Sequence, residues 1–199
     1  MKKSIRITTI LLIFIMLIML TACSRKGDGS VSAVAEQPSG SVAISMDYNQ
    51  RNTYSTNQFA IWIEDLEGNF VKTVYVTSFT ANGGYKKRED AIPIWVEKSH
   101  IAAASQKKID TISGATPKSG SLMYIWNLTD ENGESVAAGK YNVYVEATLY
   151  EKSRILFSTM IDTSGEDTNV IADAKYTTDL AKNEANITGV TATWKNPVD

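Results

Sequence analysis

Residues 59–76 read FAIWIEDLEGNFVKTVYV, and this stretch decides the fold class. Phe59, Ile61 and Ile63 alternate with Ala60 and Trp62, a period of two that is typical of a strand with one buried face. The polar segment 65–69 contains a glycine, which predicts a hairpin turn because tight turns use residues that adopt positive φ. Residues 70–76 then supply a returning strand, so the stretch predicts an antiparallel sheet.

The same alternation recurs on both sides of this hairpin. Further strands are expected at 41–46, 122–126, 141–147, 154–161 and 187–194, with turns at 130–134 and 137–140. At least seven strands with short connections favour a sandwich over a parallel sheet. We therefore expect a mainly β, Ig-like antiparallel β-sandwich domain over residues 41–199.

Two segments depart from this pattern. Ile92, Trp95, Val96 and Ser99 follow the i, i+3, i+4, i+7 spacing of a helix, which is predicted over 94–104. Trp95 on this stripe is expected in the core rather than at a ligand. The polar stretch 162–182 is expected to be an irregular surface excursion.

The composition excludes several classes of function. With 20 Lys+Arg against 22 Asp+Glu, no basic face for nucleic acid is expected. His100 and Cys23 are the only residues of their kinds, which removes intrachain disulfides, His-based triads and most metal sites. The acidic groups 64–67 and 162–167 do not match a calcium-binding loop. We predict no catalytic residue and no metal site, and an enzyme is the less favoured reading.

The first residues indicate export. Lys2, Lys3 and Arg6 precede an apolar run over 7–20 that is too short to span a bilayer, as in a secretory signal peptide over residues 1–22. The sequence LTAC at 20–23 resembles the lipobox of bacterial lipoproteins, which implies acylation of Cys23, palmitate included, and anchoring to a membrane. An ordinary secretory signal is the alternative. Residues 23–40 are expected to be the lipidated cysteine and a flexible tether, unless a first strand lies within them.

A pattern of turn residues carries a family resemblance. Trp126, Asp130, Gly133, Gly139 and Tyr141 lie in a W-x-x-x-D-x-x-G…V-x-x-G-x-Y arrangement that resembles the Ig-like domain of flagellar hook-capping proteins. The wider pattern over 41–161 resembles an uncharacterised family of exported, predicted periplasmic bacterial domains. These resemblances imply a fold and a compartment, and they do not supply an activity.

The segment 110–116, DTISGAT, is the only stretch that suggests a chemical role. It resembles the D-x-x-[ST]-G-A-T motif of FMN-binding subunits in Rnf- and Nqr-type complexes, where a flavin transferase of the ApbE type moves FMN from FAD onto the final threonine. The resemblance implies Thr116 as the attachment point, with Asp110, Ser113, Gly114 and Ala115 as its recognised surroundings.

The residue types suit that chemistry. An acceptor hydroxyl has to lie on an accessible loop, and Gly114 permits close backbone approach. No histidine or lysine adjoins Thr116, as expected of a passive acceptor that a partner enzyme activates. Asp110 is expected either to orient the segment or to help bind the transferase's metal. Pro117 departs from known acceptors and restricts Thr116 to extended φ/ψ.

Two functions follow. The first is a membrane-anchored electron carrier with FMN on Thr116 and a redox partner protein; the alternative is an Ig-like lipoprotein that acts as a binding or scaffold module. In the second, residues 110–116 form a tight Ser-Gly turn. For the flavin, the sequence offers Lys118 as a phosphate partner and, as ring shelter, the aromatic residues Tyr85, Trp95, Tyr124 and Trp126.

Overall fold

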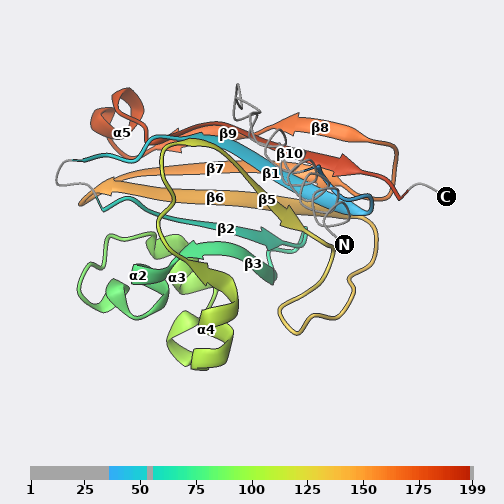
Figure 1. Cartoon of the computed structure of the whole chain (residues 1–199), viewed down its shortest axis with the longest axis horizontal. Helices are drawn as coiled ribbons and strands as arrows, with labels where there is room; N and C mark the ends of the chain where they lie inside the picture. The colour runs from blue at the N-terminus through green and yellow to red at the C-terminus, as the bar shows by residue number, and fades with distance from the viewer. Residues whose placement is uncertain (1–35, 53–55, 198–199) are drawn as a thin grey trace, which may run out of the picture. The chain divides into compact units, whose positions relative to one another are not determined.

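Two sheets make up the domain in the computed structural model, which describes residues 36–52 and 56–197 (Figure 1). Sheet A has the order β5-β1-β10-β8, and sheet B has the order β4-β3-β2-β6-β7-β9. All pairings are antiparallel except that of β3 with β4. The strand bounds are β1 (Ser41–Tyr48), β2 (Gln58–Glu64), β3 (Phe70–Thr77), β4 (Ser113–Gly114), β5 (Gly120–Trp126), β6 (Lys140–Tyr150), β7 (Ser153–Asp162), β8 (Thr168–Ile171), β9 (Asp173–Tyr176) and β10 (Ile187–Lys195). The predicted mainly β sandwich is confirmed.

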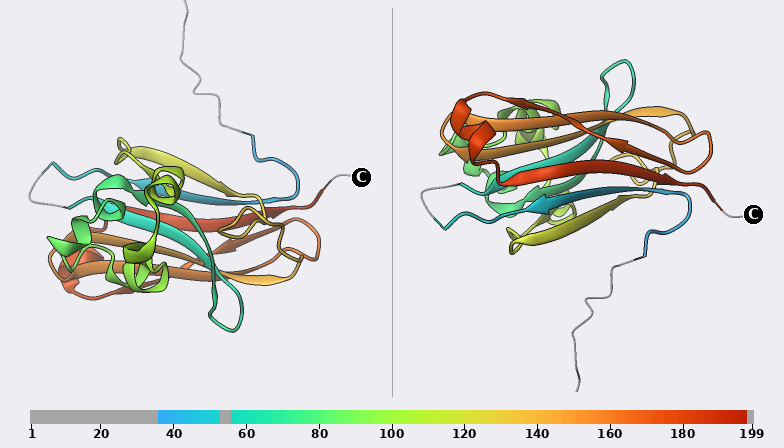
Figure 2. Two further views of the ribbon diagram at one scale, coloured as in Figure 1. Left: turned by 90° about the horizontal axis from the view of Figure 1, so that it is seen from below. Right: turned by 90° about the horizontal axis from the view of Figure 1, so that it is seen from above.

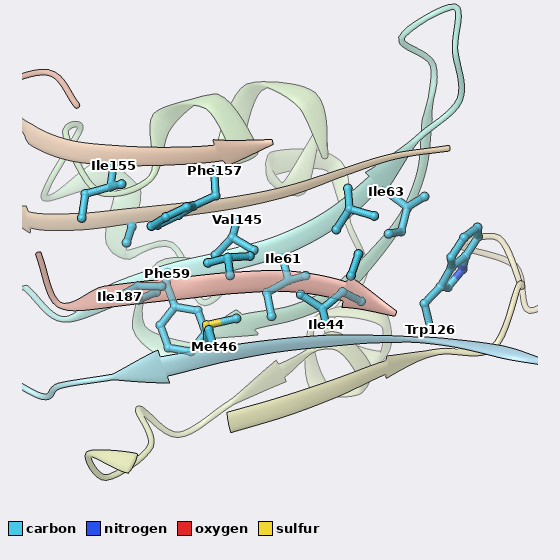
Figure 3. Packing of buried hydrophobic residues seen from close by; sticks show 14 of the residues in the cluster. Ile44, Met46, Phe59, Ile61, Ile63, Trp126, Val145, Ile155, Phe157 and Ile187 are labelled. Atoms are coloured by element: carbon cyan, nitrogen blue, oxygen red, sulfur yellow. The ribbon is translucent and has the colours of Figure 1, made fainter. Parts of the chain in front are cut away.

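The main core lies between the two sheets (Figure 3). Ile44 and Met46 of β1 face Phe59 and Ile61 of β2, and these side chains are at most 2% exposed. Their alternation along each strand is the pattern that the sequence displays. Burial of such side chains contributes roughly 1.5–3 kcal/mol each, so this layer supplies much of the stability.

The outer face of sheet B is buried as well, which corrects the expectation of one buried face for β2. Ala60 and Trp62 point away from the main core and lie under a second cluster with Trp95 and Ile101. Short helices cover this face, and Figure 2 shows them grouped together on it. They are α2 (Ser78–Ala81), η1 (Gly84–Lys86), α3 (Pro93–Lys98), η2 (Ile101–Ala103) and α4 (Gln106–Ile112).

The helix expected over 94–104 is interrupted. It consists of α3 and η2, because His100 between them has a φ of 49°, which no α-helix accommodates. Trp95 is fully buried, as expected. The prediction of a single short helix was therefore wrong for this insertion.

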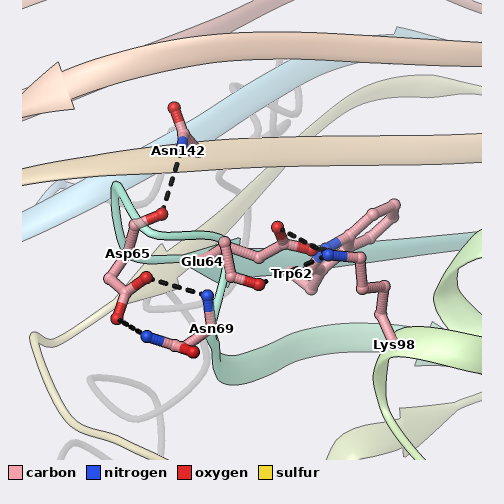
Figure 4. Close-up of polar contacts among 7 residues, drawn as sticks. Trp62, Glu64, Asp65, Asn69, Lys98 and Asn142 are labelled. Atoms are coloured by element: carbon pink, nitrogen blue, oxygen red, sulfur yellow. Dashed lines mark hydrogen bonds and ion pairs between the residues drawn. The ribbon is translucent and has the colours of Figure 1, made fainter.

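Two side chains from sheet B fix the position of α3. The buried Glu146 of β6 accepts hydrogen bonds from the backbone N–H groups of Ile94 at 3.3 Å and Trp95 at 2.9 Å. Glu64 of β2 accepts from the indole N–H of Trp62 at 2.9 Å and pairs with Lys98 at 3.2 Å (Figure 4). Both ends of this short helix are thus held by buried carboxylates.

The stretch 162–182 is more regular than expected. It contains β8 and β9, which lie at the edges of sheets A and B, followed by α5 (Asp179–Asn183). Val170 and Ala174 pack against the main core, while Asn169, Asp173 and Lys175 beside them are polar. The apolar positions are too few to predict strands, and tertiary pairing determines them.

The segment from Trp126 to Tyr141 contains only a short hairpin, in which Thr129 forms an antiparallel bridge with Ser135 and the N–H of Val136 donates to the carbonyl of Leu128 at 2.8 Å. It carries the chain from β5 in sheet A to β6 in sheet B. The two rings do pack together, at 4.9 Å in an edge-on arrangement, and the Tyr141 hydroxyl donates to the carbonyl of Ala137 at 2.5 Å. The turns expected at 130–134 and 137–140 therefore lie in a connection between the two sheets.

The expected signal peptide, residues 1–22, and Cys23 lie outside the described residues, as do residues 24–35 of the expected tether. Of that tether, Gln37 already contacts sheet A, since its side-chain amide donates to the carbonyls of Ser41 and Thr193 at 2.9 Å each.

Candidate functional site

The segment 110–116 joins the edges of the two sheets. Asp110 lies in the last turn of α4, and Ser113 and Gly114 form β4 beside Val76 and Thr77 of β3. Residues 115–119, here called the strap, have no regular secondary structure and lead to β5 at the edge of sheet A. In Figure 1 the chain leaves α4, passes in front of sheet B and turns into β5. The strap therefore crosses from one sheet to the other.

Tyr75 of β3 holds the strap in place. Its hydroxyl donates a hydrogen bond to the carbonyl of Ala115 at 2.7 Å. Its ring lies against Gly114, where an added Cβ would be 2.8 Å from the ring carbon Cε2. A glycine is therefore required here by close packing, while φ at this position is ordinary.

An aromatic cluster lies beneath this contact. The rings of Tyr75 and Tyr124 are 4.5 Å apart, Phe59 is 5.2 Å from Tyr75, and Tyr48 is 5.4 Å from Phe59. Burial raises the pKa values of Tyr75 and Tyr124, and burial together with the nearby Tyr75 raises the pKa of Tyr48 to about 12. The three hydroxyls stay protonated at neutral pH, and Tyr75 remains a hydrogen-bond donor to the strap.

Thr116 is half-buried in the strap, and its hydroxyl makes no hydrogen bond to any described residue. Asp110 and Ala115 are exposed, whereas Ser113 and Gly114 are half-buried. Asp110 accepts a hydrogen bond from Gln106 at 2.8 Å, and Gln106 also reaches Asn82. The carboxylate thus takes part in ordering α4 ahead of β4.

The aromatic residues offered as ring shelter differ in their positions. Trp95 and Trp126 are at most 1% exposed and belong to the cores, so neither is accessible to a flavin. Tyr124 lies in the cluster below the strap, and Tyr85 is half-buried in η1. Lys118 is exposed in the strap itself.

A cavity of about 480 Å³ adjoins α4. It is bounded by β3, by α4 with its N-cap Ser105, and by the turn at 131–133. Lys72, Lys107 and Lys108 line it, with Thr111 and Ile112 from the end of α4. Neither this cavity nor Tyr75 was predicted, because the residues come from separate strands and turns and form no local motif.

The other residues considered for metal or catalytic sites either stabilise the fold or lie at the surface. Glu64 is buried in the network of Trp62 and Lys98, and Asp65 caps its own turn by accepting from Asn69 at 2.8 Å. His100 is exposed at the end of α3. Within residues 36–52 and 56–197, no three His, Cys, Asp or Glu side chains are grouped to hold a metal ion.

Comparison with known proteins identifies the family. The family described as "Predicted periplasmic protein (DUF2271)" matches residues 40–180, which include the whole 110–116 segment. The chain belongs to this family. The family description agrees with the expected export from the cytoplasm, and the match ends before β10.

No curated protein and no solved structure matches the chain significantly. Among the described helices, none has both the length and the apolar character needed to cross a membrane.

Proposed function

We propose that this member of the family is an extracytoplasmic electron carrier that holds FMN covalently on Thr116. The observation that carries the proposal is the placement of Thr116, whose hydroxyl has no partner among the described residues and lies in an irregular strap. The DTISGAT sequence around it resembles the acceptor motif of FMN-binding subunits. Attached FMN would supply one- or two-electron transfer that the side chains themselves do not offer.

The residues around Thr116 fit a phosphoester at this position. A threonine whose hydroxyl is already committed to a hydrogen bond would lose that bond on modification, and Thr116 has none to lose within the described part of the chain. Ala115 adds no bulk, and the exposed Lys118 offers a positive charge two residues away. The sequence from 111 to 121 contains no histidine, aspartate or glutamate, so activation is assigned to the transferase.

The attachment step balances with FAD as the donor. Thr116 Oγ1 forms a bond to the phosphorus on the flavin side, the pyrophosphate bond breaks, AMP leaves, and the hydroxyl proton passes to the transferase. The protein then gains the mass of one FMN less one water.

The first prediction tests this step. Wild-type protein produced with a flavin transferase should gain one FMN by intact mass spectrometry and fluoresce in a denaturing gel. Thr116→Ala should abolish both signals because it removes the nucleophilic oxygen, and Thr116→Ser should retain them. Thr188→Ala, at an exposed threonine of β10, is the matched control and should be modified as the wild type is. An unmodified wild type would rule the proposal out.

A binding module is the second candidate, and one observation favours it. Ile171 of β8 is 78% exposed, Met160 of β7 is 47% exposed, and Tyr176 of β9 is 39% exposed. Exposed apolar side chains in such number are often found at protein interfaces. In this case Thr116 stays unmodified in protein from the native membrane, which the same mass measurement distinguishes.

A further inference from the structure

The cavity beside α4 has the size and charge of a ligand site, and the function proposed above does not use it. Its volume of about 480 Å³ lies within the roughly 300–1,000 Å³ typical of small-molecule sites. Ile112 and the methyl group of Thr73 give it apolar surface, whereas Asn132 and three lysines give it polar groups. This mixture suits a flat, partly polar heteroaromatic ring.

The charges in the cavity do not cancel. Lys108 pairs with Glu131 at 2.8 Å. Lys72 donates a hydrogen bond to the hydroxyl of Thr129, and Lys107 has no ion-pair partner among the described residues. Burial lowers the pKa of Lys72, which the nearby Asp130 opposes. Three lysines against Glu131 and the nearby Asp130 leave an excess of one positive charge for an anionic ligand.

The cavity is within reach of Thr116 along the chain. Thr111 and Ile112 line it, and Thr116 is four residues beyond Ile112, which limits their Cα separation to about 14 Å. FMN carries its ring on a five-carbon ribityl chain, so a phosphate on Thr116 does not confine the ring to the strap.

We propose that the cavity between α4 and the 131–133 turn holds the isoalloxazine ring of FMN attached to Thr116, with Lys72 and Lys107 beside its pyrimidine edge. This inference rests on the proposed function. A positive charge at that edge favours the reduced ring, which carries negative charge, and so raises the midpoint potential. The tether keeps the ring at high local concentration near the cavity, so a weak intrinsic affinity suffices.

The experiment uses full-length protein whose FMN content has been confirmed by intact mass. Collisional quenching by acrylamide, a neutral reagent, should be several-fold weaker for the flavin of the folded protein than after unfolding in urea. Thr111→Trp should fill the cavity from the exposed side of α4 and increase quenching at least about two-fold, without reducing FMN content.

The charge is tested separately. The double variant Lys72→Met/Lys107→Met should lower the midpoint potential measured by spectroelectrochemistry. Lys86→Met/Lys87→Met removes two charges from the exposed η1 region and should leave the potential unchanged.

Each outcome has one meaning. Equal quenching in folded and unfolded protein, or equal shifts in the two double variants, overturns the inference while FMN on Thr116 stands. Wild-type protein that carries no FMN overturns the proposed function and this inference with it. Circular dichroism of every variant confirms that the comparison is made on folded protein.

Discussion

The contact between Gly114 and Tyr75 is the most specific residue-level feature of the segment 110–116. Because an alanine Cβ would lie 2.8 Å from the Tyr75 ring, we predict that Gly114→Ala lowers the free energy of unfolding by about 1–3 kcal/mol. Urea unfolding measures this value. In a Tyr75→Val background the cost of Gly114→Ala should fall by at least about 1 kcal/mol, since the obstructing ring is gone.

Gly139 supplies the control for the Gly114→Ala measurement. It has an ordinary φ and no atom within 4 Å of a built Cβ, so Gly139→Ala should cost far less than Gly114→Ala. Equal costs for Gly114→Ala in the presence and absence of the Tyr75 ring would contradict the packing argument.

At the scale of residues, the sequence is sufficient to identify the segment 110–116. It does not reveal the tyrosine that holds this segment in place. The motif lies in one continuous segment, so it could be recognised directly. Tyr75 is on a different strand and meets Gly114 only because β3 and β4 pair in parallel. Nothing in the pattern of 70–76 indicates that one tyrosine, rather than its neighbours, contacts the strap.

At the scale of elements, the contact between Glu146 and α3 makes stability depend on pH. Burial raises the pKa of Glu146 from 4.5 to about 7, although the N–H groups of Trp95 and Ile94 oppose the shift. The folded state then binds the proton more tightly than the unfolded state. The contribution of this group is present below about pH 4.5 and is lost as pH rises through 7, in total about 3 kcal/mol.

We predict that Glu146→Gln removes the pH-dependent contribution of this residue to the free energy of unfolding. The free energy of unfolding, measured in urea between pH 5 and 8, should decrease with pH more steeply in the wild type than in the variant. Glu97→Gln, at an exposed position of α3 itself, is the control and should retain the wild-type slope. Parallel profiles for wild type and Glu146→Gln would refute the assignment.

Elements with strong alternation were predicted well, and those stabilised by tertiary contacts were not. The strands at 41–46, 59–63 and 154–161 carry regular apolar positions. The break at His100 depends on a backbone conformation that its side chain does not favour, and β8 and β9 exist because larger strands offer them free edges. Neither the backbone conformation at His100 nor the pairing of β8 and β9 with free edges can be predicted from residue propensity or apolar periodicity.

At the scale of the whole molecule, the sandwich could be predicted, but the assignment of strands to sheets could not. Alternation shows that a strand has a buried face without showing which strand is its neighbour. The turns after Trp126 close only a short hairpin, and the chain there changes sheets. The sequence also does not predict that helices pack on the outer face of sheet B. Ala60 and Trp62 are as compatible with a solvent-facing side of β2 as with a buried one.

At the same scale, the lipobox-like sequence at 20–23 predicts that Cys23 attaches the protein to a membrane. We predict that wild-type protein sediments with membranes and resists extraction by high salt, and that Cys23→Ser is released into the soluble exported fraction. Several acyl chains on one residue give stable anchoring, whereas weak surface adsorption does not survive salt. Recovery of Cys23→Ser in the membrane fraction would show that anchoring does not require this residue.

The place of β10 bears on how such a domain reaches its compartment. It is the last of the described strands along the chain, yet it lies between β1 and β8 and is the only described strand that joins them. A polypeptide that is threaded through a translocation channel from its amino end cannot complete sheet A until residues 187–195 have emerged. Completion of sheet A is thereby delayed until the last described strand has crossed, by topology alone.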